Sequence, residues 1–224
     1  MEKNNYKTIY KGATAEITEK KSRFVATIAQ VSSEEEASAF IESIKKQNWN
    51  ATHNCSAFIV GERGEGVRQS DDGEPSGTAG RPMLDVLQGA GLTNVAAVVT
   101  RYYGGTLLGT GGLVRAYSKA VQAGLSEVTT IEKIWGVMLS ITTDYNGVGK
   151  IQYLLGEKQI PIMESTYTEN VQIKILLPQG EVPALRAELI EATSGKAIID
   201  EVEELYFAML DKKVLTGDEL KGSL

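Results

Sequence analysis

The stretch from Val95 to Lys119 reads VAAVVTRYYGGTLLGTGGLVRAYSK. Its first five residues are small or β-branched and apolar, which is typical of a buried strand. Its last part begins an apolar pattern that continues past Lys119 at the i, i+3, i+4, i+7 and i+8 spacing of one helix face: Leu113, Ala116, Tyr117, Ala120 and Val121. Five glycines separate these patterns, so the stretch predicts a strand, a turn with almost no side chain, and a helix.

The glycine turn has two interpretations. It could use glycine only for backbone conformations with positive φ. A glycine-rich turn at a helix start also presents free N–H groups and the positive end of the helix dipole to an anion. The turn contains Gly104, Gly105, Gly109, Gly111 and Gly112, with Arg101 before it and Arg115 after it. Arg115 would either point back at the turn or pair with a carboxylate at 71–74. The spacing fits neither a Walker A loop nor a dinucleotide fingerprint, so the functional interpretation is a phosphate or small-anion site.

A polar loop predicted over residues 68–80 carries three carboxylates in four positions, Asp71, Asp72 and Glu74. They could hold Mg²⁺ through water ligands, act as a general acid–base pair, or form a flexible acidic turn. Arg81 follows the loop and could neutralise Glu74. A loop this long with so little apolar content is typical of a functional segment, and that function could be recognition alone.

His53 and Cys55 are the only histidine and the only cysteine, two residues apart on a predicted strand. A Cys–His nucleophile is one interpretation. Residues at this spacing on a strand are about 6.5 Å apart, too far for direct thiolate–imidazole contact. One histidine and one cysteine are also too few ligands for a metal site, and no metal is predicted. We expect a buried thiol and a hydrogen-bonded histidine, with His53 a candidate for lining the functional groove.

The segment KSRF, residues 21–24, places Lys21 and Arg23 beside a phenylalanine. If it lies near the glycine turn, it forms a basic patch suited to phosphate contacts. Tyr102 and Tyr103 could then stack on unpaired bases. The alternative is that one tyrosine belongs to the core and the lysines are only solvated.

Composition places the chain among ordinary globular proteins, with 42% apolar and 23% charged residues. A single cysteine suits a reducing cytosol, and no signal peptide or membrane-length apolar run is visible. A cytoplasmic protein with no membrane association is therefore expected. The net charge of −6 arises after residue 130, because acidic and basic residues balance before that point. The acidic second half argues against nucleic acid coating that half.

The pattern of elements predicts an α+β chain of two domains, 1–130 and 131–212, with a frayed tail at 213–224. In the first domain we expect strands at Tyr6–Lys20, Arg23–Val31, Thr52–Val60 and Val95–Val99, and helices starting at a Ser33–Glu36 capping box, near Pro82 and after the glycine turn. Residues 128–133 read as a linker. The second domain has the βαββαβ order of a ferredoxin-like plait.

Four segments resemble the IMPACT/YigZ family: KSRF, ATHNCSAF (residues 51–58), SDDGEPSGTAGRPML (residues 70–84) and RYYGGTLLGTGG (residues 101–112). Their order and spacing agree with the family over residues 5–128, and the rest agrees in layout. The resemblance implies a first domain like the second domain of a small-subunit ribosomal protein and domain IV of elongation factor G, and a second domain like domain V of that factor. It also implies a link to control of translation initiation. Eukaryotic members carry an additional N-terminal partner-binding domain that is not seen here, which makes RNA or ribosome binding the simpler expectation.

Three functions remain open. The leading one is a non-catalytic, translation-linked regulatory factor that binds RNA or the ribosome through the glycine turn and its arginines, with no cofactor. The second is a phosphate- or nucleotide-handling enzyme, or a hydrolase that uses His53, Asp71, Asp72 and Glu74. The third is a scaffold that binds a regulatory protein through the acidic second domain.

Overall fold

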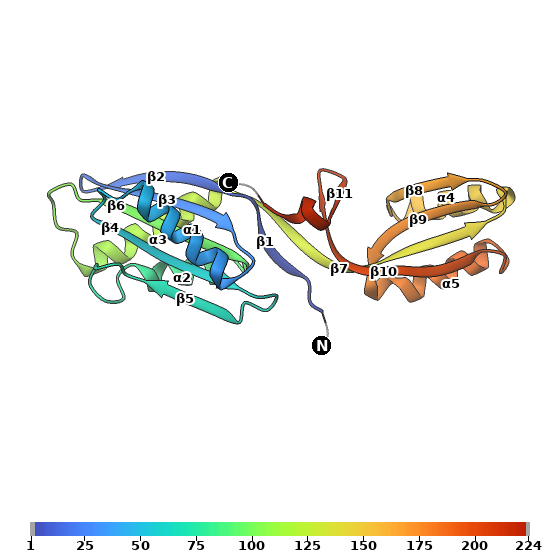
Figure 1. The fold of residues 1–224 in the computed structure, drawn as a ribbon, viewed down its shortest axis with the longest axis horizontal. Coiled ribbons are helices and arrows are strands. Elements are labelled where there is room, and N and C mark those ends of the chain that lie inside the picture. The colour runs from blue at the N-terminus through green and yellow to red at the C-terminus, as the bar shows by residue number, and fades with distance from the viewer. Residues whose placement is uncertain (1–2, 223–224) are drawn as a thin grey trace. The chain divides into compact units, whose positions relative to one another are not determined.

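The computed structural model describes residues 3–222, which fall into two compact units. One unit runs to Lys133 and includes the segment from Asp218, and the other is Ile134–Gly217. Each combines helices with an antiparallel sheet, which agrees with the mixed class of fold expected from the sequence (Figure 1). No helix in the described range is long and apolar enough to cross a bilayer.

The first unit is a sheet with helices on both faces (Figure 1). Its elements are β1 (Tyr6–Lys11), β2 (Ala13–Glu19), β3 (Ser22–Gln30), α1 (Glu34–Gln47), β4 (His53–Val60), β5 (Gly66–Ser70), α2 (Gly80–Gly89), β6 (Val95–Tyr102) and α3 (Thr110–Glu127). The sheet order is β2-β3-β6-β4-β5, and β1 pairs instead with the start of β7 (Thr129–Thr143). Helix α1 packs on one face, and α2 and α3 pack on the other.

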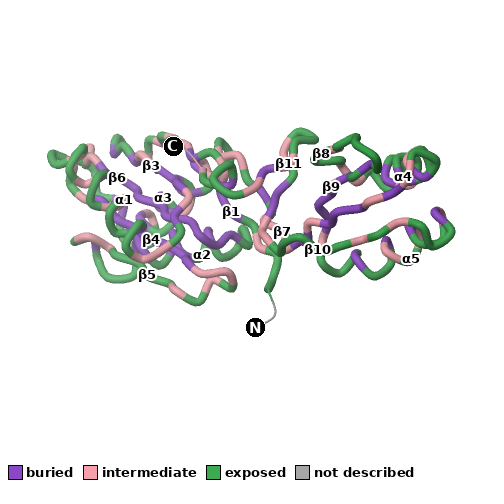
Figure 2. The backbone as a smooth tube through the Cα atoms, turned by 45° about the vertical axis from the view of Figure 1, so that its right-hand side comes forward, coloured by how far each residue is buried: buried purple, intermediate pink, exposed green. Residues whose placement is uncertain are grey.

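The alternation of side chains on the two central strands positions the candidate site. Cys55 on β4 faces the core beneath α2 and α3, whereas Phe58 packs in the cluster beneath α1. Both strands are almost wholly buried (Figure 2). His53 and Arg101 are cross-strand partners at one end of this pair. Because side chains alternate along a strand, the side chains of both residues lie on the face of the sheet that α3 covers.

The helix starts show how local sequence sets the fold. Ser33 caps α1 as predicted, because its side chain accepts a hydrogen bond from the Glu36 N–H. Helix α2 begins at Gly80, two residues before the predicted Pro82. The cause is Asp71, whose Oδ1 accepts hydrogen bonds from the N–H groups of Ala79 and Gly80 at 3.0 and 2.9 Å.

Two strand predictions in the first unit are wrong. The single strand expected at Tyr6–Lys20 is two strands that separate at the buried Gly12, because β1 and β2 pair with different partners. Residues 66–70 form β5, although a polar loop was expected from residue 68. This strand pairs only with β4 and is largely exposed, so it lacks the apolar alternation that would reveal it.

The second unit contains the rest of β7, followed by α4 (Tyr145–Glu157), β8 (Ile162–Tyr167), β9 (Val171–Pro178), η1 (Gln179–Glu181), α5 (Val182–Ala192), β10 (Ile198–Leu210) and β11 (Lys213–Thr216). Its strands lie in the order β11-β10-β7-β9-β8. Leu139, Ile173 and Leu189 are among its fully buried core residues. The first six of these helices and strands, leaving out η1, follow the predicted βαββαβ order.

Two other expectations need correction. Residues 129–133 are part of β7 and pair with β1, so they are not a linker. The predicted frayed tail at 213–224 contains β11, which pairs with β10, and the short helix η2 (Gly217–Leu220). Leu215 and Leu220 are buried, and this burial orders the segment. Its charged residues had predicted a solvated tail. Residues 223–224 lie outside the described range.

Candidate functional site

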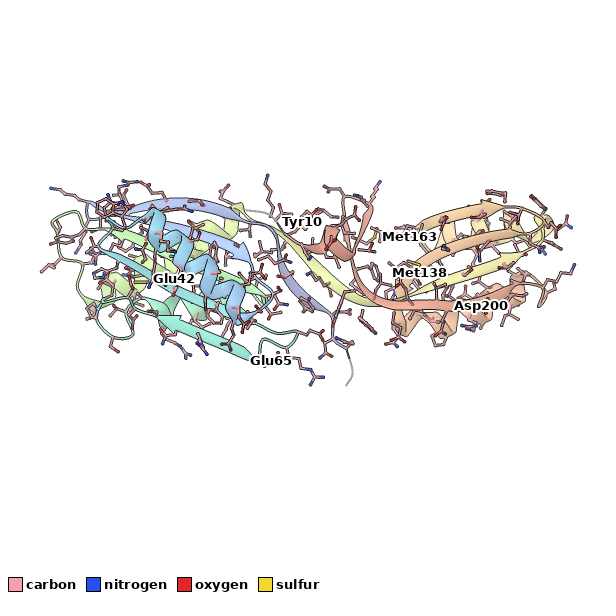
Figure 3. The ribbon with its side chains drawn as sticks, in the orientation of Figure 1. Tyr10, Glu42, Glu65, Met138, Met163 and Asp200 are labelled. Atoms are coloured by element: carbon pink, nitrogen blue, oxygen red, sulfur yellow. The ribbon has the colours of Figure 1, made fainter. Side chains whose placement is uncertain are left out.

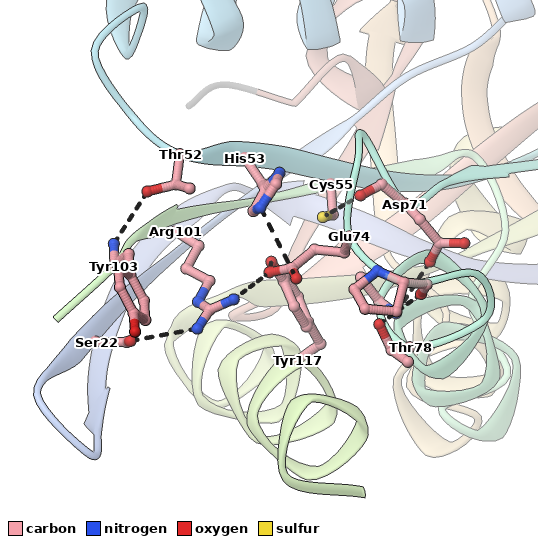
Figure 4. A network of polar contacts seen from close by, with 12 residues as sticks. Ser22, Thr52, His53, Cys55, Asp71, Glu74, Thr78, Arg101, Tyr103 and Tyr117 are labelled. Carbon is pink, nitrogen blue, oxygen red and sulfur yellow. Dashed lines mark hydrogen bonds and ion pairs between the residues drawn. The ribbon is translucent and has the colours of Figure 1, made fainter. Parts of the chain in front are cut away.

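A network of polar contacts lies at the end of the sheet where β4, β6 and α3 meet (Figure 4). Its centre is Glu74, which comes from the acidic loop and is buried. The Glu74 Oε1 atom accepts from Arg101 Nη1 at 2.6 Å and from the Tyr117 hydroxyl at 2.7 Å. Glu74 therefore ties the acidic loop to both the strand before the glycine turn and the helix after it.

Arg101 is a buried part of this network and not an exposed phosphate contact. Its side chain is 7% exposed, and its Nη2 donates to Ser22 Oγ at 3.4 Å. The guanidinium lies between the rings of Phe24 and Tyr103, 5.4 and 5.5 Å from their centroids. Its Nε has no hydrogen-bond partner in the described part of the chain. Pairing and stacking compensate for the loss of water around this charge.

His53 is held in one orientation by the acidic loop. Its Nδ1 lies 2.8 Å from the carbonyl oxygen of Asp72. Because a carbonyl only accepts, Nδ1 carries the proton, and Nε2 is left facing Glu74 Oε2 at 3.8 Å. The arrangement resembles an oriented base, but its free Nε2 faces the carboxylate of Glu74.

Cys55 does not form the nucleophile considered from the sequence. Its Sγ donates to the carbonyl oxygen of Asp71 at 3.0 Å. Burial raises the pKa of the thiol to about 12, despite a contact with Tyr117 that lowers it. A thiol that stays protonated at neutral pH is a poor nucleophile, so this residue is structural.

The three carboxylates of the acidic loop have separate sets of partners. Asp71 accepts from the N–H groups of Gly77, Ala79 and Gly80. Asp72 pairs with Lys45 at 3.0 Å and accepts from the Asn54 N–H. Glu74 is engaged with Arg101, and no group of three metal-binding side chains occurs within residues 3–222. This geometry gives no support to the magnesium and hydrolase interpretations.

Backbone geometry requires glycine at several positions of this turn, whereas the anion-binding interpretation stays a prediction. A Cβ on Gly104 would lie 2.0 Å from the Lys21 carbonyl oxygen, so the turn and the KSRF hairpin touch through their backbones. Gly105 and Gly109 have φ values of 82° and 72°, which strain any other residue. Gly109 precedes α3 and provides no side-chain cap, so the helix N-terminus is left open.

The basic residues around the turn differ in availability. Lys21 and Arg115 are exposed, and no described residue pairs with either. Arg115 Nη1 lies 3.7 Å from the position of a Cβ on Gly111, so this side chain points back at the turn. It forms no ion pair with a described carboxylate of the acidic loop. Arg23 pairs with Glu16 at 2.8 Å. Arg81 pairs with Asp85 at 2.8 Å and not with Glu74.

The two tyrosines have different surroundings. Tyr102 is partly buried, its hydroxyl donates to Asn48 Oδ1 at 2.8 Å, and Arg23 stacks on its ring. Tyr103 is 45% exposed, and its N–H donates to the Thr52 side chain at 3.1 Å. Only Tyr103 offers an open ring for stacking.

These segments enclose a cavity of about 440 Å³, here called the glycine-loop cavity. His53, Glu74 and Arg101 line it, together with Tyr103, Leu108 and the start of α3. From the sequence, Tyr117 is expected only in the core and Ser22 has no expected role, although both belong to the network. The hydroxyl of Tyr117 on an apolar helix face was the signal for such a contact, because a buried hydroxyl needs a hydrogen-bond partner.

Comparisons with known proteins cover both units. Residues 20–125 match the Impact N-terminal domain, and residues 141–196 match a Domain of unknown function (DUF1949). The chain is 44% identical over 203 residues to the Bacillus subtilis protein "IMPACT family member YvyE", covering 91% of this chain and 94% of that protein. It is 39% identical over 187 residues to "IMPACT family member YigZ" of Escherichia coli, covering 83% and 92%. A solved structure titled "Crystal structure of an hypothetical protein" aligns at 36% identity with a TM-score of 0.57, covering 89% and 98%.

Proposed function

This chain belongs to the IMPACT family, and from that premise we propose that it is a non-catalytic, translation-linked regulatory factor whose first unit binds RNA or the ribosome. The binding surface is the glycine-loop face, defined here as Lys21, Tyr103, Arg115 and the first turn of α3. The observation that carries the proposal is the uncapped N-terminus of α3, with the unpaired Arg115 pointing back at it and the unpaired Lys21 on the hairpin that contacts the glycine turn. A free helix N-terminus binds phosphate groups, and a phosphate backbone supplies them in series.

The exposed ring of Tyr103 adds a contact that a simple anion site would not need. Arg101 stacks on one side of this ring, and the Thr52 side chain holds its backbone. Stacking of unpaired bases on aromatic side chains is the common way in which proteins hold single-stranded RNA. The face therefore combines phosphate contacts with a stacking surface.

The role of Arg101 in this proposal differs from the expectation. It positions Tyr103 and Glu74 from within the fold, while Lys21 and Arg115 make the phosphate contacts. A substitution of Arg101 would therefore test folding more than binding. Variants of the two exposed residues are the informative ones.

The proposed link to translation depends on similarity of fold. The first unit is compared with domain IV of elongation factor G and with a ribosomal protein domain, and the second with the ferredoxin-like domain V of that factor. The βαββαβ order and the sheet order of the second unit support this comparison. Fold alone does not define function, so the comparison supports the proposal only by analogy. A cytoplasmic location follows from the same proposal.

A regulatory protein partner is a second candidate, and it would bind the second unit. Strand β10 exposes an acidic series that includes Asp200 (Figure 3) and Glu203. Ile198 and Val202 on the same strand are 61% and 52% exposed. Exposed apolar groups beside charges are typical of a protein contact surface.

Co-sedimentation with purified ribosomes across a salt series tests the leading proposal. Wild-type protein should bind at low salt and be released as salt rises. A Lys21→Glu/Arg115→Glu variant should bind more weakly, with a slope of log K against log salt that is less steep by about 0.7–0.9 for each lost phosphate contact. Lys7→Glu/Lys11→Glu makes the same change of charge at two exposed positions on β1 and should bind like the wild type. Equal binding by the double variant, or no binding of wild type at low salt, would reject the glycine-loop face.

A further inference from the structure

We propose that the glycine-loop cavity binds a nucleoside monophosphate, either free or as the phosphorylated end of an RNA strand. This inference rests on the proposed function, because it names the chemical group that the same face would hold. It is carried by three sets of groups: open N–H donors in the first turn of α3, which meets the cavity at Thr110, and the unpaired acceptors and apolar walls that line the cavity.

The donors lie at the start of α3. The first hydrogen bond of this helix runs from Leu113 N–H to the Gly109 carbonyl. The N–H groups of Thr110, Gly111 and Gly112 therefore have no partner within the helix, and no described residue accepts from them. Three such groups at the positive end of an 18-residue helix suit the oxygens of one phosphate.

Arg101 supplies an independent sign that a ligand belongs here. It lines the same cavity, its side chain is only 7% exposed, and its Nε donates to nothing in the described chain. Buried donors are nearly always satisfied, so an orphaned one points to an absent acceptor. Its partner Glu74 already neutralises the charge of the guanidinium, which leaves the helix N-terminus and Arg115 to attract the anion.

The acceptors come from the acidic loop and from β4, which line the same cavity. Glu74 Oε2 accepts no hydrogen bond from the described residues, and His53 Nε2, at 3.8 Å, is beyond hydrogen-bond distance. Since His53 Nδ1 donates to Asp72, a neutral ring leaves Nε2 as a second acceptor. Two acceptors this close suit the neighbouring hydroxyl groups of a ribose.

The remaining lining is apolar. Tyr103, Leu107 and Leu108 border the cavity together with Pro75. Leu107 is 80% exposed, although a leucine gains nothing from contact with water. These walls provide a surface for a planar base. The volume of about 440 Å³ lies within the roughly 300–1,000 Å³ of small-molecule sites.

Other anions fit these groups less well. Inorganic phosphate would satisfy the α3 donors and leave both acceptors and the apolar walls unused. A dicarboxylate would place its second charge beside Glu74, and repulsion would oppose its binding. A phosphate joined to a hydroxylated sugar and a planar base uses all three sets of groups.

Isothermal titration of the full chain with AMP, adenosine and inorganic phosphate tests the proposal. AMP should bind roughly tenfold or more tightly than either fragment, because each fragment meets only part of the site. Gly111→Asp should weaken AMP binding roughly tenfold by placing a carboxylate at the phosphate position, and should leave adenosine binding unchanged. The side chain has room, since a Cβ there meets only Arg115 Nη1 at 3.7 Å, and its charge favours the helix start, so the variant should fold. Gln122→Glu adds the same charge to α3 outside the cavity and should bind AMP like the wild type.

AMP that binds no better than phosphate, or binds Gly111→Asp as it binds wild type, would overturn the inference. Decanucleotide RNA with a 5′-phosphate, a 3′-phosphate or neither distinguishes the two sources of the nucleotide. A preference for a phosphorylated end that Gly111→Asp abolishes assigns the site to RNA. AMP binding without any RNA or ribosome binding keeps this site for a free nucleotide and rejects the proposed function. RNA binding that does not depend on a terminal phosphate, together with no AMP binding, keeps the proposed function and rejects the nucleotide site.

Discussion

Glu74 and Arg101 form a buried ion pair, with Glu74 Oε1 2.6 Å from Arg101 Nη1 and side chains 3% and 7% exposed, respectively. The pair joins the acidic loop to the strand before the glycine turn. Both residues are also hydrogen-bonded elsewhere, to Tyr117 and Ser22. A pair buried this deeply makes each residue depend on the other.

The first prediction concerns the stability of this pair. Arg101→Met should lower the free energy of unfolding by about 3–5 kcal/mol, because it leaves the Glu74 carboxylate buried without its cation. Glu74→Gln/Arg101→Met should be less destabilised than Arg101→Met, since it removes both charges. Urea denaturation at pH 7 measures the difference. Arg23→Met breaks the exposed pair with Glu16 and serves as control, with a far smaller expected change. A double variant that is less stable than Arg101→Met would contradict the argument.

The second prediction concerns Cys55. Its thiol is fully buried, and that burial raises its pKa to about 12, so the native protein should react very slowly with an aromatic disulfide reagent at pH 8. One equivalent should react at once in 6 M guanidinium chloride, the internal control for a free thiol. Fast labelling of the native protein, with a rate that rises around pH 8.5, would show instead an accessible thiol with an ordinary pKa.

The parts of the fold that the sequence predicted well are those with a local signal. The strand at Val95 and the helix from Thr110 have clear apolar patterns, and the Ser33 capping box specifies its own hydrogen bond. Strand β5 has no such pattern because it is an exposed edge. The strand at residues 213–216 depends on pairing with β10, and charge alone predicted a frayed tail there.

Several residues of the candidate site were predictable from the sequence, but the contacts between them were not. Glu74 and Arg101 were both singled out, yet the pair between them spans 27 positions and has no local pattern. Tyr117 reaches Glu74 across 43 positions. Sequence spacing paired Glu74 with Arg81 instead, because nearby charges are the only ones that spacing can compare. Burial decides between them, and burial is a property of the whole fold.

The third prediction concerns acid stability. Burial opposes the ionisation of Asp71, but hydrogen bonds from Gly77, Gly80 and Ala79 outweigh it and lower the pKa of the carboxyl below its ordinary 3.8. A lowered folded-state pKa contributes stability that is present above 3.8 and lost as pH falls through the folded-state value. Asp71→Asn should therefore destabilise the protein at pH 7, and the difference from wild type should shrink below pH 3.8. Urea titrations at both pH values measure it. A difference that stays constant with pH would show that the charge of Asp71 is not what α2 requires.

The fourth prediction separates two glycines of the same turn. A Cβ on Gly104 would lie 2.0 Å from the carbonyl oxygen of Lys21, and backbone cannot move aside as a flexible side chain can.

Gly104→Ala should therefore push the hairpin away from the turn and destabilise the first unit, whereas Gly111→Ala has room and should stabilise α3 by about 0.5–1 kcal/mol. Thermal unfolding of the two variants beside wild type provides the comparison, with each serving as the control for the other. Because the Lys21 hairpin is half of the glycine-loop face, Gly104→Ala should also weaken ribosome binding while Gly111→Ala remains folded. A Gly104→Ala variant as stable as wild type would mean that the turn and the hairpin are not in contact. That result would contradict the glycine-loop face as a single surface.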